Sequence, residues 1–184
     1  EEDFILKNIF KDYSDIDLSK IKQIKSNRLS FKQTFEYSNK YYPTQIKILC
    51  NSDIYFDNSL KHLYRLNFDK LFLSLTRINE TLNGKNYMKL EPSGKRSQDT
   101  WIWEGPINIK ETQDYKEDGI LLGIWGCDNR INYIIKESNY KVKNYCNLIK
   151  TYHKHLYDNH RNDAHKKGKK YKKPYFNPEI EDIN

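Results

Sequence analysis

Two short apolar runs constrain the fold of this chain more than any other feature of its sequence. Ile46–Cys50 and Leu71–Thr76 are each dominated by apolar residues over the length of a single strand. Runs of this kind predict strands that are buried on both faces, as in a parallel sheet between layers of helices. We therefore expect Ile46–Cys50 to be the central strand of the sheet, with Leu71–Thr76 next to it.

Segments with helical patterns alternate with the predicted strands. Ser30–Gln33 has the spacing of a capping box and begins a helix that ends before Pro43. Asn58–Leu66 and Asp128–Asn139 are also expected to be helical, the second because its isoleucines recur at helical spacing. Thr100–Trp103 is expected to be a strand. This alternation predicts an α/β fold with a mostly parallel central sheet flanked by helices.

The positive charge of the chain is concentrated near its C-terminus. The net charge is +7, and nine Lys and Arg against two Asp between Lys150 and Lys173 give that same value, whereas the last eleven residues carry −3. We expect one domain over residues 1–157 and a solvated tail, basic and then acidic, over 158–184. The tail is expected to be dispensable for folding unless its aromatic residues dock on the domain. Nucleic acid is an expected partner only through this tail.

Other features of the sequence indicate the cellular compartment in which the protein is expected. No apolar run approaches the ~20 residues that a membrane-spanning helix needs, and the acidic start is unlike a secretory signal. The three cysteines are widely spaced and suggest neither a disulfide framework nor a zinc knuckle. We therefore expect a cytoplasmic protein without a membrane span.

A polar cluster follows the first apolar run. Asn51 and Asp53 come directly after it, and Asp57 lies four residues further on. Oxygen ligands at the end of a rigid strand suit Mg²⁺ or Mn²⁺, and such a cation can neutralise a diphosphate leaving group. The alternative is that Asp53 caps a turn and Asp57 caps the helix that follows.

Three further positions are candidates for chemistry. Asp128 lies where a predicted helix begins, and the helix N-terminus favours its charged form by ~0.3–1 kcal/mol, so it can accept a proton or bind a sugar hydroxyl. The alternative is a simple N-cap. His153 and His155 lie on one face of a predicted strand and either complete a metal site or are structural. Beside Asp99, Trp101 either stacks on a sugar ring or belongs to the core.

Taken in sequence order, the first predicted strand with its polar cluster, the second strand, the helix that begins at Asp128 and the last strand with its histidine resemble the second half of a GT-A-type glycosyltransferase. They also resemble a poorly characterised glycosyltransferase-like group found in bacteria and in large DNA viruses. If the protein is viral, this resemblance implies that it is located in the cytoplasm of the host cell. The resemblance covers roughly residues 20–157 and implies a GT-A, Rossmann-like fold. The first nucleotide-binding strand of that fold is not evident before residue 20. The segments that carry the resemblance are NSDIYFD, SQDTWIW, GCDNRI and TYHKHL.

The resemblance implies that a hexose is transferred from a nucleotide-diphosphate sugar to a hydroxyl of a glycan or protein, with Mn²⁺ or Mg²⁺. Asn51 stands at the first acidic position of the family's metal-binding motif and Asp53 at its second. Asp128 would be the base or would position the sugar. The remaining implied roles are donor binding by Asn51, Asp53 and Arg130, substrate contacts by Asp99 and Trp101, and metal ligation by Asp53, Asp57, His153 and His155.

Two other functions remain open. The first is a degenerate transferase-like domain that binds a glycan, a nucleotide or a protein without catalysis. The second is a metal-dependent nuclease, because His153, His155, His160 and His165, with Asn159 and Asn162, loosely resemble a His-Asn-His site and the tail is basic. A metal-dependent nucleotide-sugar binding assay separates the three.

Overall fold

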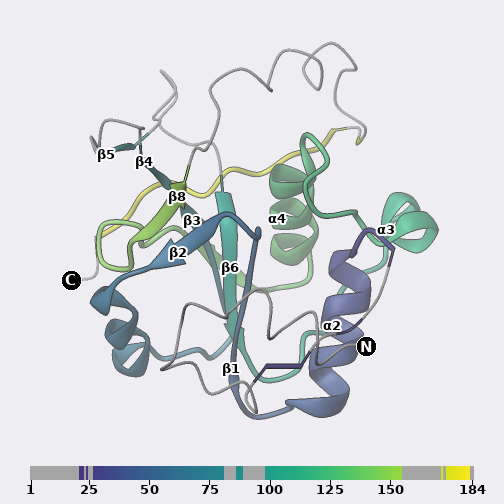
Figure 1. The fold of residues 1–184 in the computed structure, drawn as a ribbon. Helices are drawn as coiled ribbons and strands as arrows, with labels where there is room; N and C mark the ends of the chain where they lie inside the picture. Colours follow the sequence, from purple (N-terminus) through teal and green to yellow (C-terminus); the bar gives the residue numbers. More distant parts are fainter. Residues whose placement is uncertain are drawn as a thin grey trace, which may run out of the picture.

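The strands of this protein form two four-stranded sheets (Figure 1). The structure is a computed structural model, and it describes residues 21–22, 24, 27–80, 86–88, 98–154, 171 and 173–182. The first sheet has the order β1-β6-β3-β7 and the second the order β2-β8-β4-β5. The strands are β1 (Ile46–Cys50), β2 (Ile54–Phe56), β3 (Leu71–Thr76), β4 (Ile78–Glu80), β5 (Asn86–Met88), β6 (Gln98–Glu104), β7 (Lys141–Lys143) and β8 (Thr151–Lys154).

The first sheet is mostly antiparallel. Strand β6 lies between β1 and β3 and runs antiparallel to both, and only β3 and β7 are parallel. The expected α/β architecture, a mostly parallel Rossmann-like sheet flanked by helices, is therefore wrong. The expectation that β1 is central is also wrong, because β1 lies at the edge and Ile48 is 40% exposed. Apolar runs show which segments are buried strands, but they do not show that β6 returns between two of them.

The second sheet continues from the first. A short turn connects β1 to β2, and the single residue Arg77 connects β3 to β4. Strand β8 pairs with β2 in antiparallel orientation and with β4 in parallel orientation. We call the region where β1 and β3 end, and where β6, β4 and β8 begin, the junction.

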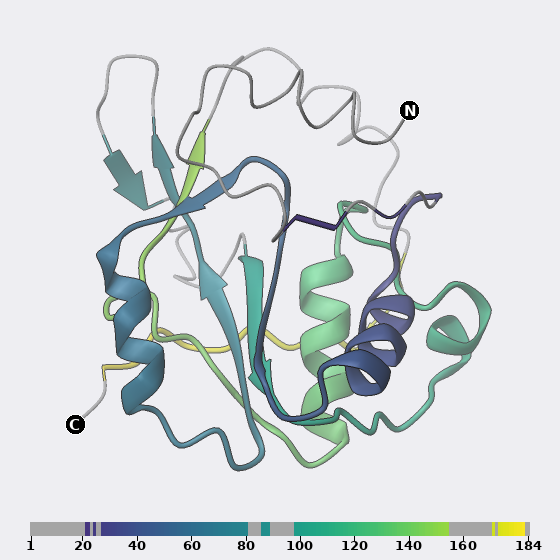
Figure 2. The ribbon, with the colours of Figure 1, turned by 60° about the horizontal axis from the view of Figure 1, so that its bottom comes forward.

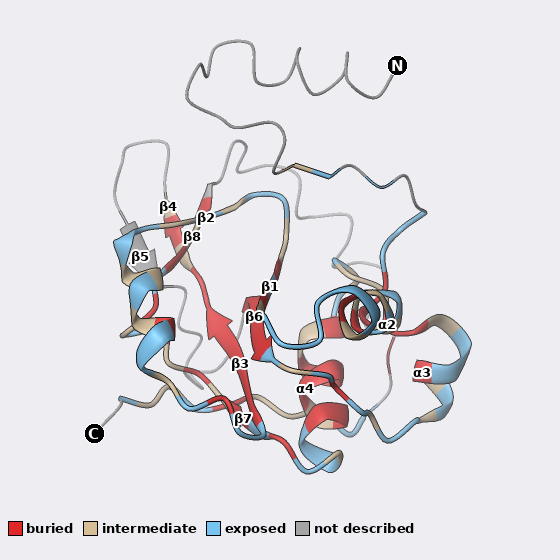
Figure 3. Ribbon diagram, turned by 90° about the horizontal axis from the view of Figure 1, so that it is seen from below, coloured by how far each residue is buried: buried red, intermediate tan, exposed pale blue. Residues whose placement is uncertain are grey.

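Two helices cover one face of the first sheet (Figures 2 and 3). These are α2 (Phe31–Tyr41) and α4 (Cys127–Glu137). Helix α2 begins with the predicted capping box, because Ser30 Oγ accepts a hydrogen bond from the Gln33 backbone N–H at 3.2 Å. Phe31 and Phe35 then meet Trp101 and Trp103 edge to face, with ring centroids 4.7 and 5.1 Å apart. This aromatic packing holds α2 on the sheet.

The other face of the sheet is covered by the 3-10 helix η2 (Asn58–Arg65), which lies where a helix was predicted. Leu63 of η2 packs in a second apolar cluster with Leu73, Leu75 and Ile102. All six residues of β3 are consequently buried, as its apolar sequence predicted (Figure 3). In the part of the chain that the structure describes, no helix is long and apolar enough to cross a membrane.

The described residues near the C-terminus pack on the domain. Tyr171 is buried, and its hydroxyl accepts a hydrogen bond from the Leu121 backbone N–H at 2.7 Å. Phe176 donates its backbone N–H to the Asn129 carbonyl at 3.0 Å. The aromatic residues of the expected solvated tail therefore dock on the body of the molecule, and residues 158–170 lie outside the described part.

Candidate functional site

Polar side chains from segments far apart in the sequence meet at the junction. They come from the end of β1 and its turn, from the connection between β3 and β4, from the start of β6, and from β8. Strand pairing brings these segments together, because β6 begins beside the end of β1 and β8 pairs with β4. We call this set the junction cluster: Asn51, Asp53, Arg77, Asn79, Asp99 and His153.

The buried part of the junction cluster is a continuous hydrogen-bond network. Arg77 forms an ion pair with Asp99 and donates its Nε–H to Asn79 Oδ1 at 3.1 Å. Asn51 donates its side-chain amide to Asp99 Oδ1 at 3.0 Å, and its backbone N–H to the Asp99 carbonyl at 3.2 Å. The network therefore ties the turn after β1 to the start of β6.

Asp53 and His153 form the outer part of the junction cluster. His153 Nε2 and Asp53 Oδ2 lie 2.8 Å apart, although the residues are 100 positions apart in the sequence. The His153 side chain is 8% exposed, whereas that of Asp53 is 48% exposed. Within β8, His153 lies opposite Asn79 of β4. Asp53 is therefore a carboxylate that ligands can reach, backed by a buried imidazole.

Asp57 does not join this cluster. Its carboxylate caps η2 by accepting the Ser59 backbone N–H at 2.8 Å, and it accepts the Tyr152 hydroxyl at 2.9 Å. Hydrogen bonds from Ser59 lower the pKa of Asp57. Tyr152 and His153 are successive residues of one strand, so their side chains point to opposite faces. The structure therefore separates Asp57 from Asp53 and gives it the capping role.

The side chains of Trp101 and Arg130 contact other residues and do not belong to the junction cluster. Trp101 is buried against Phe31, so its ring is not available to stack on a sugar. Arg130 Nε lies 2.6 Å from Asp114 Oδ2, and its Nη1 donates to the Pro174 carbonyl at 3.0 Å. Asp114 belongs to α3 (Gln113–Asp118). Arg130 thus connects α4 to α3 and to the C-terminal segment, where sequence reasoning had placed it among the donor-binding residues.

Asp128 lies in the first turn of α4, after Gly126 at the N-cap, whose φ is 88°. Helix α4 begins at the end of the first sheet where β6 begins (Figures 1 and 2). The pairing of β6 with β3 shifts register at Asp99, because Leu75 pairs with Thr100 and Thr76 pairs with Gln98. Asp128 and the start of β6, which carries Asp99, therefore lie at the same end of the sheet.

The thiol of Cys127, the residue before Asp128, does not supply a nucleophile. Cys127 is buried, and burial raises its pKa to about 12. Because the reactive form of cysteine is the thiolate, this residue is inert at neutral pH. Asp128 is therefore the group in this turn that can take part in acid–base chemistry.

The junction cluster offers few ligands for a metal ion. Among the described residues, no group of three or more His, Cys, Asp or Glu side chains is arranged to hold a metal ion. Asp53 and His153 provide one carboxylate and one imidazole, which Mn²⁺ accepts. Mg²⁺ and similar cations are often bound by one or two protein ligands together with substrate phosphates. His155, the other expected histidine ligand, lies outside the described residues.

Sequence reasoning missed Arg77 and Asn79. Arg77 directly follows the apolar run Leu71–Thr76 and Asn79 comes two residues later, at the same kind of position as the predicted cluster after β1. A charged residue between two strand-like segments, at the point where one sheet passes into the next, was the available signal. Its buried partner Asp99 shows that this charge belongs to the interior.

No protein-family model, curated protein or solved structure matches the chain significantly. The junction cluster and Asp128 are therefore the basis for a functional assignment.

Proposed function

We propose that this protein is a metal-assisted glycosyltransferase that moves a hexose from a nucleotide-diphosphate sugar to a hydroxyl of a glycan or protein. The observation that carries the proposal is the meeting of Asp53 and His153 at 2.8 Å beside Asn51 and Asp99. These residues belong to three of the segments that resemble glycosyltransferases. Asp53 and His153 are 100 positions apart in the sequence, so their contact comes from the fold and not from sequence proximity.

In this proposal, Asp53 and His153 would hold Mn²⁺ or Mg²⁺ together with the diphosphate of the donor. A bound cation would supply the positive charge that neutralises the diphosphate leaving group. The buried network of Asn51, Asp99 and Arg77 fixes the turn that carries Asp53, so the carboxylate is positioned before the donor binds. Without such a fixed position, part of the binding energy would be lost in ordering the turn.

Asp128 is the proposed base, or the group that positions the sugar. Its place in the first turn of α4 favours the charged carboxylate. A charged carboxylate accepts the proton of an attacking hydroxyl or a hydrogen bond from the transferred sugar. The location of Asp128 at the same end of the sheet as the junction cluster supports this division of roles.

The proposal is tested by nucleotide release and sugar transfer from a panel of nucleotide sugars, with and without Mn²⁺. The wild-type chain should act on at least one donor only with the cation, and Asp53→Asn should lose most of that activity. Asp128→Asn should bind the donor normally and lose about 10²-fold or more in transfer. Asp57→Asn is the matched control, because asparagine also caps a helix and Asp57 lies away from the cluster.

Two results would replace the proposal. A wild-type chain that neither binds nor cleaves any donor, even with Mn²⁺, is a degenerate transferase-like domain. A chain that ignores nucleotide sugars but cuts DNA in the presence of the cation is a nuclease.

A further inference from the structure

Strand β6 contains a bulge where it enters the junction. Thr76 of β3 pairs with Gln98, and the residue before it pairs with Thr100, so Asp99 is the extra residue of β6. A bulge bends its strand and redirects a side chain, and bulges are frequent beside active sites. The redirected carboxylate of Asp99 forms its ion pair with Arg77, the residue after Thr76. The position of Thr76 therefore decides where the two charges meet.

A buried asparagine holds Thr76 in this position. Asn144 Oδ1 accepts the Thr76 backbone N–H at 3.0 Å, and Asn144 Nδ2 donates to Thr76 Oγ1 at 2.8 Å. Both residues are fully buried, although they are 68 positions apart in the sequence. A side-chain amide carries an acceptor and a donor side by side, so one asparagine satisfies both the backbone and the hydroxyl of Thr76.

The backbone of Asn144 is itself held by the C-terminal segment. Strand β7 ends at Lys143, and Asn144 forms a parallel bridge with Ile180. The Asn144 carbonyl accepts the Glu181 backbone N–H at 3.0 Å, and the Glu181 carboxylate forms an ion pair with Lys143 Nζ at 2.6 Å. The residue that holds Thr76 is therefore anchored in the fold through its own main chain.

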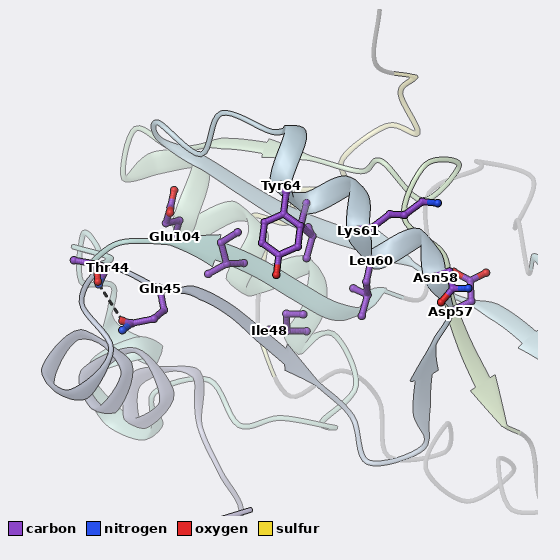
Figure 4. A pocket seen from close by; sticks show the side chains of 11 residues that line it. Thr44, Gln45, Ile48, Asp57, Asn58, Leu60, Lys61, Tyr64 and Glu104 are labelled. Carbon is purple, nitrogen blue, oxygen red and sulfur yellow. Dashed lines mark hydrogen bonds between the residues drawn. The ribbon is translucent and has the colours of Figure 1, made fainter. Parts of the chain in front are cut away.

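Strand β1, which leads to Asp53, depends on β6 for its position. Among the described residues, β6 is the only strand that pairs with β1. An open groove of about 1070 Å³ lies between β1 and η2, and Ile48 and Tyr64 line it (Figure 4). At its β1 end, the turn that carries Asp53 is therefore held by β6.

The bulged residue of β6 makes this connection to the turn. Asn51 donates its backbone N–H to the Asp99 carbonyl at 3.2 Å and its side-chain amide to Asp99 Oδ1 at 3.0 Å. The Ile54 backbone N–H then donates to the Asn51 carbonyl at 3.2 Å and closes the turn that carries Asp53. A displacement of Asp99 would therefore disturb both hydrogen bonds that hold Asn51.

We propose that Asn144 is a positioning residue of the junction cluster. It is buried and acts through Thr76, which it holds so that Arg77 and Asp99 meet and the turn presents Asp53 to a ligand. The proposal rests on the proposed function for the identity of that ligand, a nucleotide-diphosphate sugar. A turn that is fixed before the ligand binds avoids the loss of binding energy in ordering it.

The test measures backbone hydrogen exchange of the full chain, residue by residue, under conditions in which the chain stays folded. In Asn144→Ala, the amides of Asn51 and Ile54 should exchange about tenfold faster or more, because Thr76 loses its partner and the junction opens locally. The amides of α2, which lies on a face of the sheet away from these contacts, should exchange as in the wild type.

Two variants of the partner residue change less. Thr76→Val keeps the shape of the side chain but loses the hydroxyl that accepts from Asn144, so it should speed the same amides by a smaller factor. Thr76→Ser keeps the hydroxyl and should behave like the wild type. Ser38→Ala is the matched control, because it removes a buried hydrogen bond to the Phe35 carbonyl within α2. It should leave the amide of Asn51 unchanged.

Donor titration separates this proposal from the proposed function. Where the wild-type chain binds a nucleotide-diphosphate sugar, Asn144→Ala should weaken that binding by about tenfold, and Ser38→Ala should not. A wild-type chain that binds no donor refutes the proposed function, whereas hydrogen exchange still decides the role of Asn144. Unchanged exchange at Asn51 and Ile54 in both Asn144→Ala and Thr76→Val overturns the positioning role. An equal increase in α2 also overturns it, because that result shows a general loss of stability.

Discussion

Arg77 and Asp99 bring opposite charges into the interior of the molecule, where their side chains are only 10% and 13% exposed. Removing one partner of a buried pair leaves the other charge without its compensation. We expect Asp99→Ala to lower the free energy of unfolding by about 3–5 kcal/mol, measured by urea denaturation. The exposed pair Lys116–Glu111, 3.5 Å apart, is the control, and Glu111→Ala should cost less than about 1 kcal/mol. Equal losses for the two variants would contradict a structural role for the buried pair.

Candidate site residues could be recognised in the sequence where polar side chains lie next to an apolar run. Asn51 and Asp53 follow β1, whereas Asp99 and His153 lie within β6 and β8. The structure pairs Asn51 with Asp99 and Asp53 with His153. Asp57 and Arg130 were also candidates, but Asp57 caps a helix and Arg130 forms an ion pair with Asp114. Such partners come from the tertiary structure, so residue type and spacing cannot distinguish a capping carboxylate from a ligand.

At the scale of elements, the Arg130–Asp114 contact connects α3 to α4. Partial burial of Asp114 opposes its ionisation, but the hydrogen bonds and charge of Arg130 outweigh this and lower its pKa. A lowered pKa stabilises the fold above the pKa of the unfolded chain, about 3.9 for aspartate. The stabilisation is lost as the pH falls through the folded-state value.

We therefore expect the wild-type chain to lose stability on acidification below about pH 4, and Asp114→Asn to be less stable at neutral pH with a weaker dependence on acid. Thermal unfolding at a series of pH values measures both. Parallel pH profiles for the two chains would contradict the stabilising role of this carboxylate.

The elements themselves were more predictable than their arrangement. The bounds of β1 and β3, the capping box of α2 and the helix at α4 follow from local patterns of apolar and capping residues. The order of strands depends on where β6 pairs, and no local pattern encodes that pairing. A buried antiparallel strand and a buried parallel strand have the same apolar character when helices cover both faces, so the sheet was predicted with the wrong orientation.

At the scale of the whole molecule, the C-terminal segment closes the apolar cluster beneath α4. Tyr171 is buried, and Tyr175 and Phe176 pack against the cluster. Burying such side chains contributes about 1.5–3 kcal/mol each. Deletion of residues 171–184 should therefore lower the urea midpoint strongly. If this deletion left the urea midpoint unchanged, the tail would be dispensable for folding, as the charge pattern predicted.

The central claim for the whole molecule is that the junction cluster holds a cation together with a nucleotide-diphosphate sugar. Isothermal titration of the wild-type chain with a panel of these donors, with and without Mn²⁺, tests it most directly. We expect one donor to bind only when Mn²⁺ is present, Asp53→Asn to weaken that binding by about tenfold or more through loss of the ligand charge, and Asp57→Asn to bind like the wild type. Binding that is independent of Mn²⁺, or equal losses in Asp53→Asn and Asp57→Asn, would contradict the claim.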